Sequence, residues 1–180
     1  MLFLEKLVEI LSNAWERVAP FVIVMPWRHT VILRLGHPVR ALGTGFHWKW
    51  PLADDPLDVD TAETTMRLPP QSLTTQDLRD VIVTVIVKYR IADPIKYVSA
   101  VTDQIDALAD VISGETAKAI RGLTLEALLA DPPERAVATA VRRRVHRYGF
   151  EIVEDGITFA DLTRGKSLRL VLPVGKDLAN

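Results

Sequence analysis

The residue types that most often carry catalysis or bind metals are present in this sequence, but they are scattered. The four histidines, His29, His37, His47 and His146, fall in different predicted turns, strands and helices and have no metal-ligand spacing. There is no cysteine, which excludes disulfides, thiol nucleophiles and thiolate metal sites. No serine lies in a nucleophile elbow, and the glycines fit no nucleotide-binding fingerprint. We therefore expect no catalytic site, no metal and no cofactor.

Two clusters of charged residues remain as candidate functional sites. Residues 54–63 are acidic but lack the glycine and terminal glutamate of an EF-hand loop, so a solvated acidic loop is expected. Residues 142–147 carry four arginines on a predicted helix with an opposite apolar face, which indicates a solvated side or an intersubunit charge surface. Together they predict a head-to-tail homo-oligomer contact that weakens with salt. Its residues are Asp54, Asp55, Asp58, Arg142, Arg143 and Arg147.

A net charge of −1 gives no electrostatic footprint for nucleic acid, and no nucleic-acid partner is expected. A chain of 180 residues can bury a core without disulfides or metals.

A long strand is the element around which the other elements must be arranged. From Val81 to Ile91 every second residue is apolar, which predicts a strand with one buried face. Asp93-Pro94 ends the strand and begins a helix, because proline cannot donate to a β ladder and aspartate is a good N-cap. Shorter strands are predicted at 30–34, 39–42, 46–50 and 150–153. One helix is expected to end near Gly122, and another to start at 131–134 and end at Gly149. These elements predict an α+β domain with a mainly antiparallel sheet and segregated helices, arranged in two lobes.

The first eighteen residues have the clearest helical pattern in the chain. Their apolar side chains fall in one arc when successive residues are placed 100° apart, with mixed charges opposite. Three partners stay open for this stripe: a membrane interface, a neighbouring subunit, or the rest of the same chain. The arc consists of Phe3, Leu4, Leu7, Val8, Ile10, Leu11, Ala14, Trp15 and Val18.

The apolar run from Val18 to Met25 follows this helix and is too short to cross a bilayer alone, since a spanning helix needs about 20 apolar residues. Glu5 and Glu9 interrupt any secretory signal core. The run is interpreted either as a shallow membrane insert or as an edge strand from Phe21. Trp27, Trp48 and Trp50 serve equally as interfacial anchors or as sheet packing.

Four motifs, in this order, resemble the Band 7 family, also called SPFH after stomatin, prohibitin and flotillin. They are the segment R-A-L-G-T-G-F-H-W-K-W-P-L at 40–52, the "T-x-D" at Thr75 with the long strand and its Y-R-I-A-D-P end, the segment A-K-A-I-R-G-L-T-L-E-A-L-L at 117–129, and the strand at 148–158. The resemblance spans about residues 31 to 162. It divides the chain into an amphipathic, membrane-proximal segment at 1–26, a Band 7-like domain at 27–162 and a short strand or tail at 163–180.

The resemblance implies a non-enzymatic scaffold on the cytoplasmic side of a membrane. Such a domain would assemble laterally with copies of itself or with a related longer subunit, and would organise membrane proteins or lipids or serve a membrane protease. Residues 3–25 would dip into one leaflet. The implied membrane- or partner-contacting residues are Phe3, Leu4, Leu7, Val8, Ile10, Leu11, Trp15, Val18, Phe21 and Val22.

The family commonly continues into a long coiled coil, whereas this sequence has no heptad repeat and stops about twenty residues after Thr158. One more strand or tail is predicted at 168–174. The departure favours an alternative function, a soluble structural subunit of a phage or other bacterial particle. In that case the amino-terminal helix would bind a neighbouring subunit and no lipid.

Overall fold

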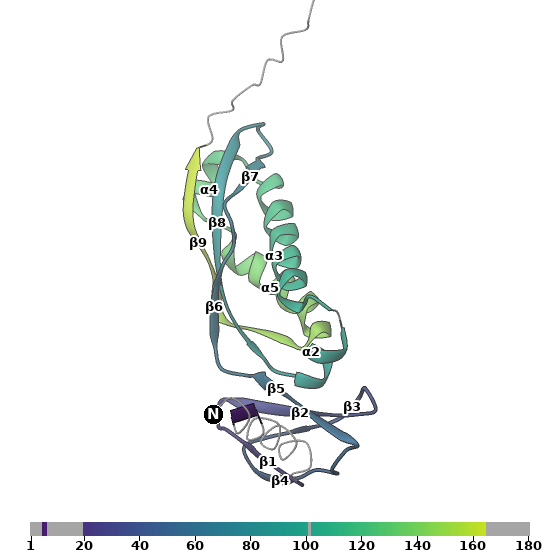
Figure 1. The fold of residues 1–180 in the computed structure, drawn as a ribbon. Coiled ribbons are helices and arrows are strands. Elements are labelled where there is room, and N and C mark those ends of the chain that lie inside the picture. Colours follow the sequence, from purple (N-terminus) through teal and green to yellow (C-terminus); the bar gives the residue numbers. More distant parts are fainter. Residues whose placement is uncertain (1–4, 7–19, 101, 165–180) are drawn as a thin grey trace, which may run out of the picture.

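The computed structural model describes residues 5–6, 20–100 and 102–164, which form a small strand-only lobe and a larger lobe of sheet and helices (Figure 1). The small lobe contains β1 (Phe21–Val24), β2 (Arg28–Arg34), β3 (His37–Leu42), β4 (Gly45–Trp48) and β5 (Asp54–Asp60). The strands of the larger lobe are β6 (Thr64–Arg67), β7 (Gln71–Thr74), β8 (Asp80–Ile91) and β9 (Phe150–Arg164). Its helices are α2 (Pro94–Ala100), α3 (Gln104–Arg121), α4 (Leu125–Ala130), α5 (Glu134–Val145) and the 3-10 turn η1 (His146–Tyr148).

The predicted amino-terminal helix and the predicted strand at 168–174 lie outside the described residues, apart from Glu5 and Lys6, which are helical. The α+β class with antiparallel sheets is confirmed.

The small lobe is built from two antiparallel units. Strands β1 and β4 form a two-stranded ribbon, and β3, β2 and β5 form a three-stranded sheet. Val24, Ile32 and Leu42 make a small buried core between them, with Val22 packed against it. The strand interpretation of the run beginning at Phe21 is therefore confirmed.

The prediction of a solvated loop for the acidic residues was wrong. Residues 54–60 form β5, which pairs with β2 along its whole length. Two contacts explain the difference: Arg34 on β2 binds the buried carboxylate of Asp54, and the Thr30 hydroxyl donates to Asp58 at 2.7 Å. A carboxylate with such partners can lie within a strand although aspartate alone disfavours one.

The larger sheet is organised by β8. It pairs with β6 and β7 along one edge and with β9 along the other. The alternation seen in the sequence is confirmed, because Val81, Val83, Val85 and Val87 are at most 1% exposed. A strand of 12 residues gives β9 a long template, and β9 runs for 15 residues, beyond both the predicted strand at 150–153 and the family-like segment at 148–158.

Helices α3 and α5 cover the apolar face of this sheet (Figure 1). Ile112 of α3 and Val141 of α5 are fully buried in the same cluster as Phe150 of β9. The opposite face of the sheet is mixed, since β8 places Ile82, Thr84, Ile86, Lys88 and Arg90 on it. It is crossed by the ion pair between Arg67 and Asp161, at 3.1 Å, which spans from β6 to β9 over the central strand.

The turn before β8 is fastened to the start of α4. The Asp77 carboxylate accepts hydrogen bonds from the Thr75 hydroxyl at 2.6 Å and from the Leu125 backbone N–H at 3.1 Å. The hydrogen bond from Thr75 is the main cause that lowers the pKa of Asp77. The "T-x-D" pattern thus places a carboxylate at a helix amino terminus, where a negative charge is favoured. Strand β7 and helix α4 were not predicted as elements.

Two helix boundaries test the local reasoning. Gly149 ends the α5–η1 segment in the left-handed conformation as predicted, with φ of 82°. A Cβ at this position would overlap the carbonyl oxygen of Asp93, so only glycine fits. Helix α5 begins at Glu134, with Pro133 as its N-cap residue. This is two residues later than a helix with Asp131 as its N-cap would begin. The backbone N–H of Glu134 donates to the carbonyl oxygen of Pro132.

We expect Val85→Asp to abolish folding of the larger lobe, because it buries a carboxylate without a partner at a cost of about 4 kcal/mol or more. Ile82→Asp is the matched control, since Ile82 lies on the other face of the same strand and is 38% exposed. It should cost less than about 1 kcal/mol. Thermal melting followed by circular dichroism checks both, and equal losses for the two variants would show that the faces are assigned wrongly.

Candidate interaction surface

An apolar surface covers the outer face of the β1–β4 ribbon. The register pairs Phe21 with Trp48 and Ile23 with Phe46, which places these four side chains on one face. They are between 40% and 65% exposed. The rings of Phe21 and Phe46 stack with their centroids 5.4 Å apart. Large side chains on this ribbon therefore pack on one another at the surface, while Val22 and Val24 alternate with them toward the core.

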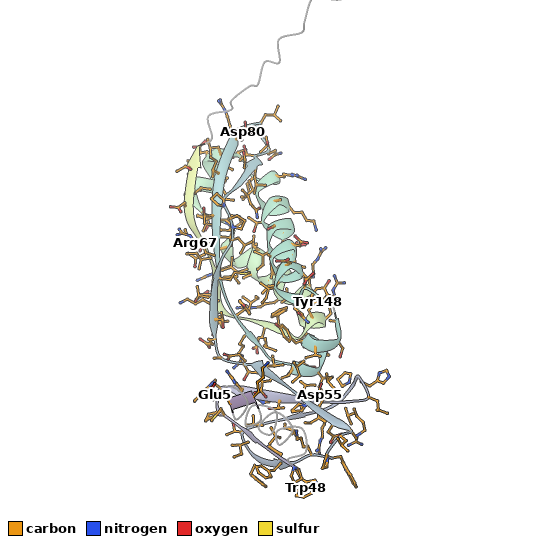
Figure 2. All side chains as sticks on the ribbon, viewed as in Figure 1. Glu5, Trp48, Asp55, Arg67, Asp80 and Tyr148 are labelled. Carbon is orange, nitrogen blue, oxygen red and sulfur yellow. The ribbon has the colours of Figure 1, made fainter. Side chains whose placement is uncertain are left out.

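Further exposed apolar side chains lie in the chain segments that flank the two strands of the ribbon. The contributing side chains there are 49% to 88% exposed. We call the whole set the apolar end: Phe21, Ile23, Met25, Trp27, Phe46, Trp48, Trp50 and Leu52. In Figure 2 Trp48 lies at one extremity of the molecule and Asp80 at the other. Soluble monomers rarely expose large contiguous apolar patches, and such patches mark interaction sites.

Hydrogen bonds to neighbouring segments fix the position of this ribbon. The His47 ring Nε2 lies 2.7 Å from the carbonyl oxygen of Gly43, and Arg40 donates to the carbonyl oxygen of Trp48 at 2.7 Å. The backbone N–H of Lys49 donates to the carbonyl oxygen of Pro20 at 2.9 Å. Gly45 allows the turn that leads from β3 into β4, because it has a φ of 131°. The aromatic side chains are therefore presented by a braced ribbon.

An ion pair between half-exposed Arg34 and buried Asp54 positions the loop that carries Trp50. Arg34 donates through Nε and Nη2 to the two carboxylate oxygens of Asp54, at 2.8 and 3.2 Å. The same carboxylate accepts the backbone N–H of Trp50 at 3.0 Å. The hydrogen bond from Arg34 is the main cause that holds the pKa of Asp54 below its usual value, although burial acts in the opposite direction. The Asp54 side chain is fully shielded from solvent.

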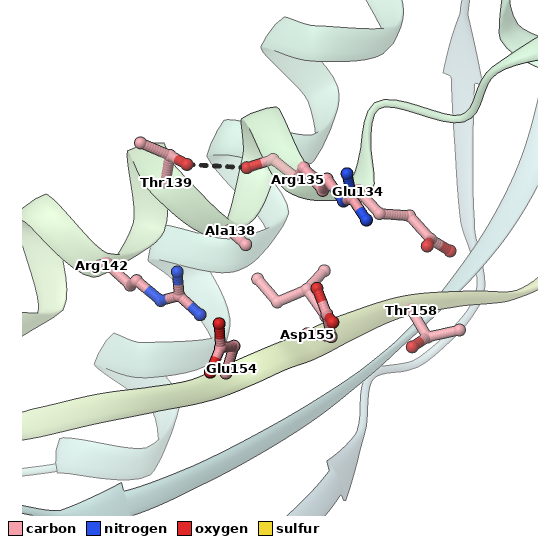
Figure 3. A pocket seen from close by; sticks show the side chains of 9 residues that line it. Glu134, Arg135, Ala138, Thr139, Arg142, Glu154, Asp155 and Thr158 are labelled. Carbon is pink, nitrogen blue, oxygen red and sulfur yellow. Dashed lines mark hydrogen bonds between the residues drawn. The ribbon is translucent and has the colours of Figure 1, made fainter.

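A second feature is a polar groove of about 510 Å³ between α5 and β9, shown in Figure 3. It contains both signs of charge, from Arg135 and Arg142 and from Glu134, Glu154 and Asp155. Within the described ranges, no group of three or more His, Asp or Glu side chains is arranged to hold a metal ion. The groove has no histidine, serine or lysine among its lining residues.

Comparison with protein families decides what the chain is. The family model for the SPFH domain / Band 7 family matches residues 22–168, which is most of the chain. The chain belongs to the Band 7 family. An uncharacterised protein of Archaeoglobus fulgidus is 32% identical over 109 residues, covering 61% of this chain and 44% of that protein. Stomatin homologues of Pyrococcus horikoshii and Pyrococcus abyssi are each 30% identical over 109 residues, covering 61% of this chain and 41% of theirs. The chain thus spans less than half the length of these relatives.

Of the ten predicted membrane- or partner-contacting residues of this Band 7 chain, only Phe21 and Val22 are among the described residues. Phe21 belongs to the apolar end, and Val22 is on the inner side of the same strand. The other predicted membrane-contacting residues, from Phe3 to Val18, lie outside the described residues. The packing alternative for Trp48 and Trp50 is not what the structure shows, since both are more than 60% exposed. No helix in the described part of the chain is long and apolar enough to cross a membrane.

The six predicted oligomer-contact residues are divided between the two lobes, and most bind within the chain. Asp54 and Asp58 have partners on β2. Arg142 donates to the carbonyl oxygens of Ile152 and Val153. The Arg147 guanidinium lies 4.7 Å from the centre of the Tyr148 ring. Exposed Asp55 and Arg143 complete the set. A contact between copies through these residues stays a prediction. Fewer of the charged groups are available for such a contact than the sequence suggests, because most already bind within the chain.

The predicted membrane insert at residues 3–25 included Ile23 and Met25, but the sequence analysis did not assign Phe46 or Leu52 to a contact surface. The available signal was the alternation of large apolar residues at 21 and 23 and at 46, 48 and 50 around two glycines. That pattern predicts a strand but leaves open whether its apolar face turns inward, because Val22 and Val24 are apolar too.

We expect the stability of the small lobe to depend on the charge of Asp54. Its pKa is lowered by folding, so the stabilisation is complete above the unfolded value of about 4 and is lost as the pH falls through the folded pKa. Thermal melts between pH 7 and pH 2 should show this loss. Asp54→Asn should cost about 1 to 3 kcal/mol at pH 7 and should have a flatter acid profile. An unchanged acid profile in Asp54→Asn would contradict this assignment.

Proposed function

We propose that this chain is a non-enzymatic Band 7 scaffold that docks at the cytoplasmic side of a membrane through the apolar end. The single observation that carries the proposal is the exposed aromatic and aliphatic face of the β1–β4 ribbon. Band 7 and stomatin-like proteins are generally non-enzymatic and typically associate with membranes and form oligomers. This chain would therefore serve as one unit of a membrane-bound assembly.

The composition of the apolar end favours a lipid interface. Three of its eight side chains are tryptophan, Trp27, Trp48 and Trp50, and two are phenylalanine. Tryptophan prefers the boundary between headgroups and acyl chains, because its ring is apolar and its N–H is polar. The four ribbon side chains share one exposed face, which suits entry into a flat lipid surface.

Charge contributes little to this docking. Arg28 and Arg40 are exposed in the small lobe, but so are Asp55 and Asp60. Attraction to anionic headgroups is worth about 1 kcal/mol for each basic residue near the surface, and here the two signs oppose one another. Docking should therefore depend on apolar insertion and should persist in high salt and on neutral lipids.

Lateral assembly is the second part of the proposed function. The surrounding copies, or a related longer subunit, would place many apolar ends on one membrane patch. Binding then becomes multivalent, so a weak insertion by each copy suffices for a stable attachment. Such an array could organise membrane proteins or lipids, and a membrane protease is one candidate client.

The alternative function is that of a soluble structural subunit of a particle, and the apolar end could serve that function too. An exposed aromatic face can be buried against a neighbouring protein subunit as well as against lipid. In that case the chain would form a stable protein complex through the apolar end and would show no affinity for vesicles.

Flotation of the full chain with neutral phosphatidylcholine vesicles tests the proposal. We expect the native chain to float, and Phe46→Glu with Trp48→Glu to lower vesicle binding at least tenfold, because a charge in the interface opposes insertion. Leu78→Glu is the matched control, since Leu78 is 84% exposed on the turn before β8, at the end of the molecule far from the apolar end. It should float like the native chain.

Two results would count against membrane docking. The first is a Phe46→Glu, Trp48→Glu chain that floats as well as the native one. The second is a native chain that never floats but forms a complex that the double substitution dissolves, which would establish the particle-subunit alternative. A Leu7→Glu, Leu11→Glu chain, tested in the same way, measures how much of the vesicle binding depends on the predicted amino-terminal helix.

A further inference from the structure

The outer edge of β9 has no neighbouring strand in the described part of the chain. Strand β9 pairs with β8 alone, and at 15 residues it is the longest strand of the domain. An unpaired strand edge presents backbone N–H and C=O groups that can pair with another chain. In a protein that assembles side by side, this edge would be brought close to its copies repeatedly.

Helix α5 sends an arginine to the carbonyl oxygens of this strand. Arg142 donates from Nη2 to the carbonyl oxygen of Val153 at 2.9 Å and from Nε to that of Ile152 at 3.3 Å. Tyr89 of β8 lies opposite Ile152, whereas no residue of β8 is paired with Val153. At Val153 the guanidinium therefore takes the place of a donor that a neighbouring strand would supply.

The same helix sends a carboxylate to the same strand seven residues further along. Glu134 Oε1 accepts the backbone N–H of Phe159 at 2.7 Å. Figure 3 shows Glu134 and Arg142 at the two ends of the groove between α5 and β9. One side chain satisfies a donor of β9 and the other satisfies two acceptors, which is the complement that an added strand would offer.

Between these two contacts the strand is irregular. Asp155 has a φ of 52°, and the pairing with β8 shifts register between Val87 and Tyr89. A Cβ on Gly156 would come within 2.7 Å of the carbonyl oxygens of Lys88 and Val153, so the backbone is closely packed there. Such a bulge interrupts the straight edge that a partner strand needs.

We propose that Arg142 and Glu134 block the edge of β9 and prevent it from pairing with a strand of a second copy. The inference goes beyond membrane docking, because it determines how copies can meet. Lateral assembly must then use side-chain surfaces and not a continuous intersubunit sheet. It also gives Arg142 a role within the chain that differs from the oligomer contact expected from the sequence.

The opposite edge of the sheet is closed by other means. Strands β6 and β7 are four residues each and are separated by Pro69 and Pro70. Proline cannot donate to a β ladder, and short strands offer little to pair with. Only the β9 edge is long enough, among the described strands of this sheet, to need side chains that block it.

The test compares the oligomeric state of Arg142→Ala with Glu134→Ala, made together in the full chain, with that of the native protein. We expect the double variant to form β-rich assemblies at a concentration at least tenfold lower, seen as growth in mass by light scattering and as thioflavin T fluorescence. Arg143→Ala is the matched control, because Arg143 is exposed on the same helix, and it should behave like the native chain. A double variant with the native mass and no thioflavin signal at every concentration would overturn the proposal.

A further variant separates edge pairing from simple unfolding. Adding Thr158→Lys to the double variant places a lysine on the exposed β9 strand, and lysine on an edge opposes strand pairing. We expect it to restore the native mass without restoring the two lost contacts. If the triple variant assembles as readily as the double variant, the assemblies arise from a destabilised fold and the proposal is wrong.

Discussion

The pairing of β8 with strands on both of its edges is the constraint on which the rest of this structure depends. Its buried valines form one wall of the main core, and α3 and α5 can pack there because β9 and β6 extend the same face. The polar side chains of the open face then find partners across the central strand, as Arg67 does with Asp161. Loss of this strand would remove the core, the helix docking site and the connection to the small lobe together.

The small lobe uses the same two-residue period for a different result. In β8 one face is apolar and is buried by helices. In β1 both faces are apolar, and the face that it shares with Phe46 and Trp48 of β4 is left exposed. The stability of this arrangement comes from the inner face and from the Arg34–Asp54 pair, so the outer face is free to serve an interaction. Aromatic side chains that lie outside the core of the small lobe are consistent with binding to an apolar partner.

Local patterns predicted those parts of the fold that local chemistry determines. The alternation through Val85 predicted β8, and Gly149 predicted the end of a helix, because a period and a left-handed residue are visible in a few positions. Strand β7 and helix α4 escaped prediction because each is short and depends on distant partners, such as the bond from Leu125 to Asp77. The acidic strand β5 was misassigned for the same reason: its carboxylates need Arg34 and Thr30, which are remote in sequence.

The candidate surface was predicted only in part. Trp48 and Trp50 could be named as possible anchors, but their exposure depends on which apolar face of the ribbon meets Ile32 and Leu42, and periodicity does not decide that. The contacts of Arg142 could not be predicted from the sequence either, because its acceptors are backbone carbonyl oxygens, which carry no sequence pattern. A run of arginines reads as a charged surface, whereas the fold directs one of them onto the edge of β9.

Depth-dependent quenching of tryptophan fluorescence tests the central claim most directly. The chain has 4 tryptophans, and Trp15→Phe in the full chain leaves Trp27, Trp48 and Trp50, all of which belong to the apolar end. On vesicles with brominated acyl chains, docking through the apolar end predicts a blue shift, strong quenching by bromine, and protection from aqueous iodide. A chain that binds vesicles while these tryptophans stay open to iodide and unquenched by bromine would contradict the account.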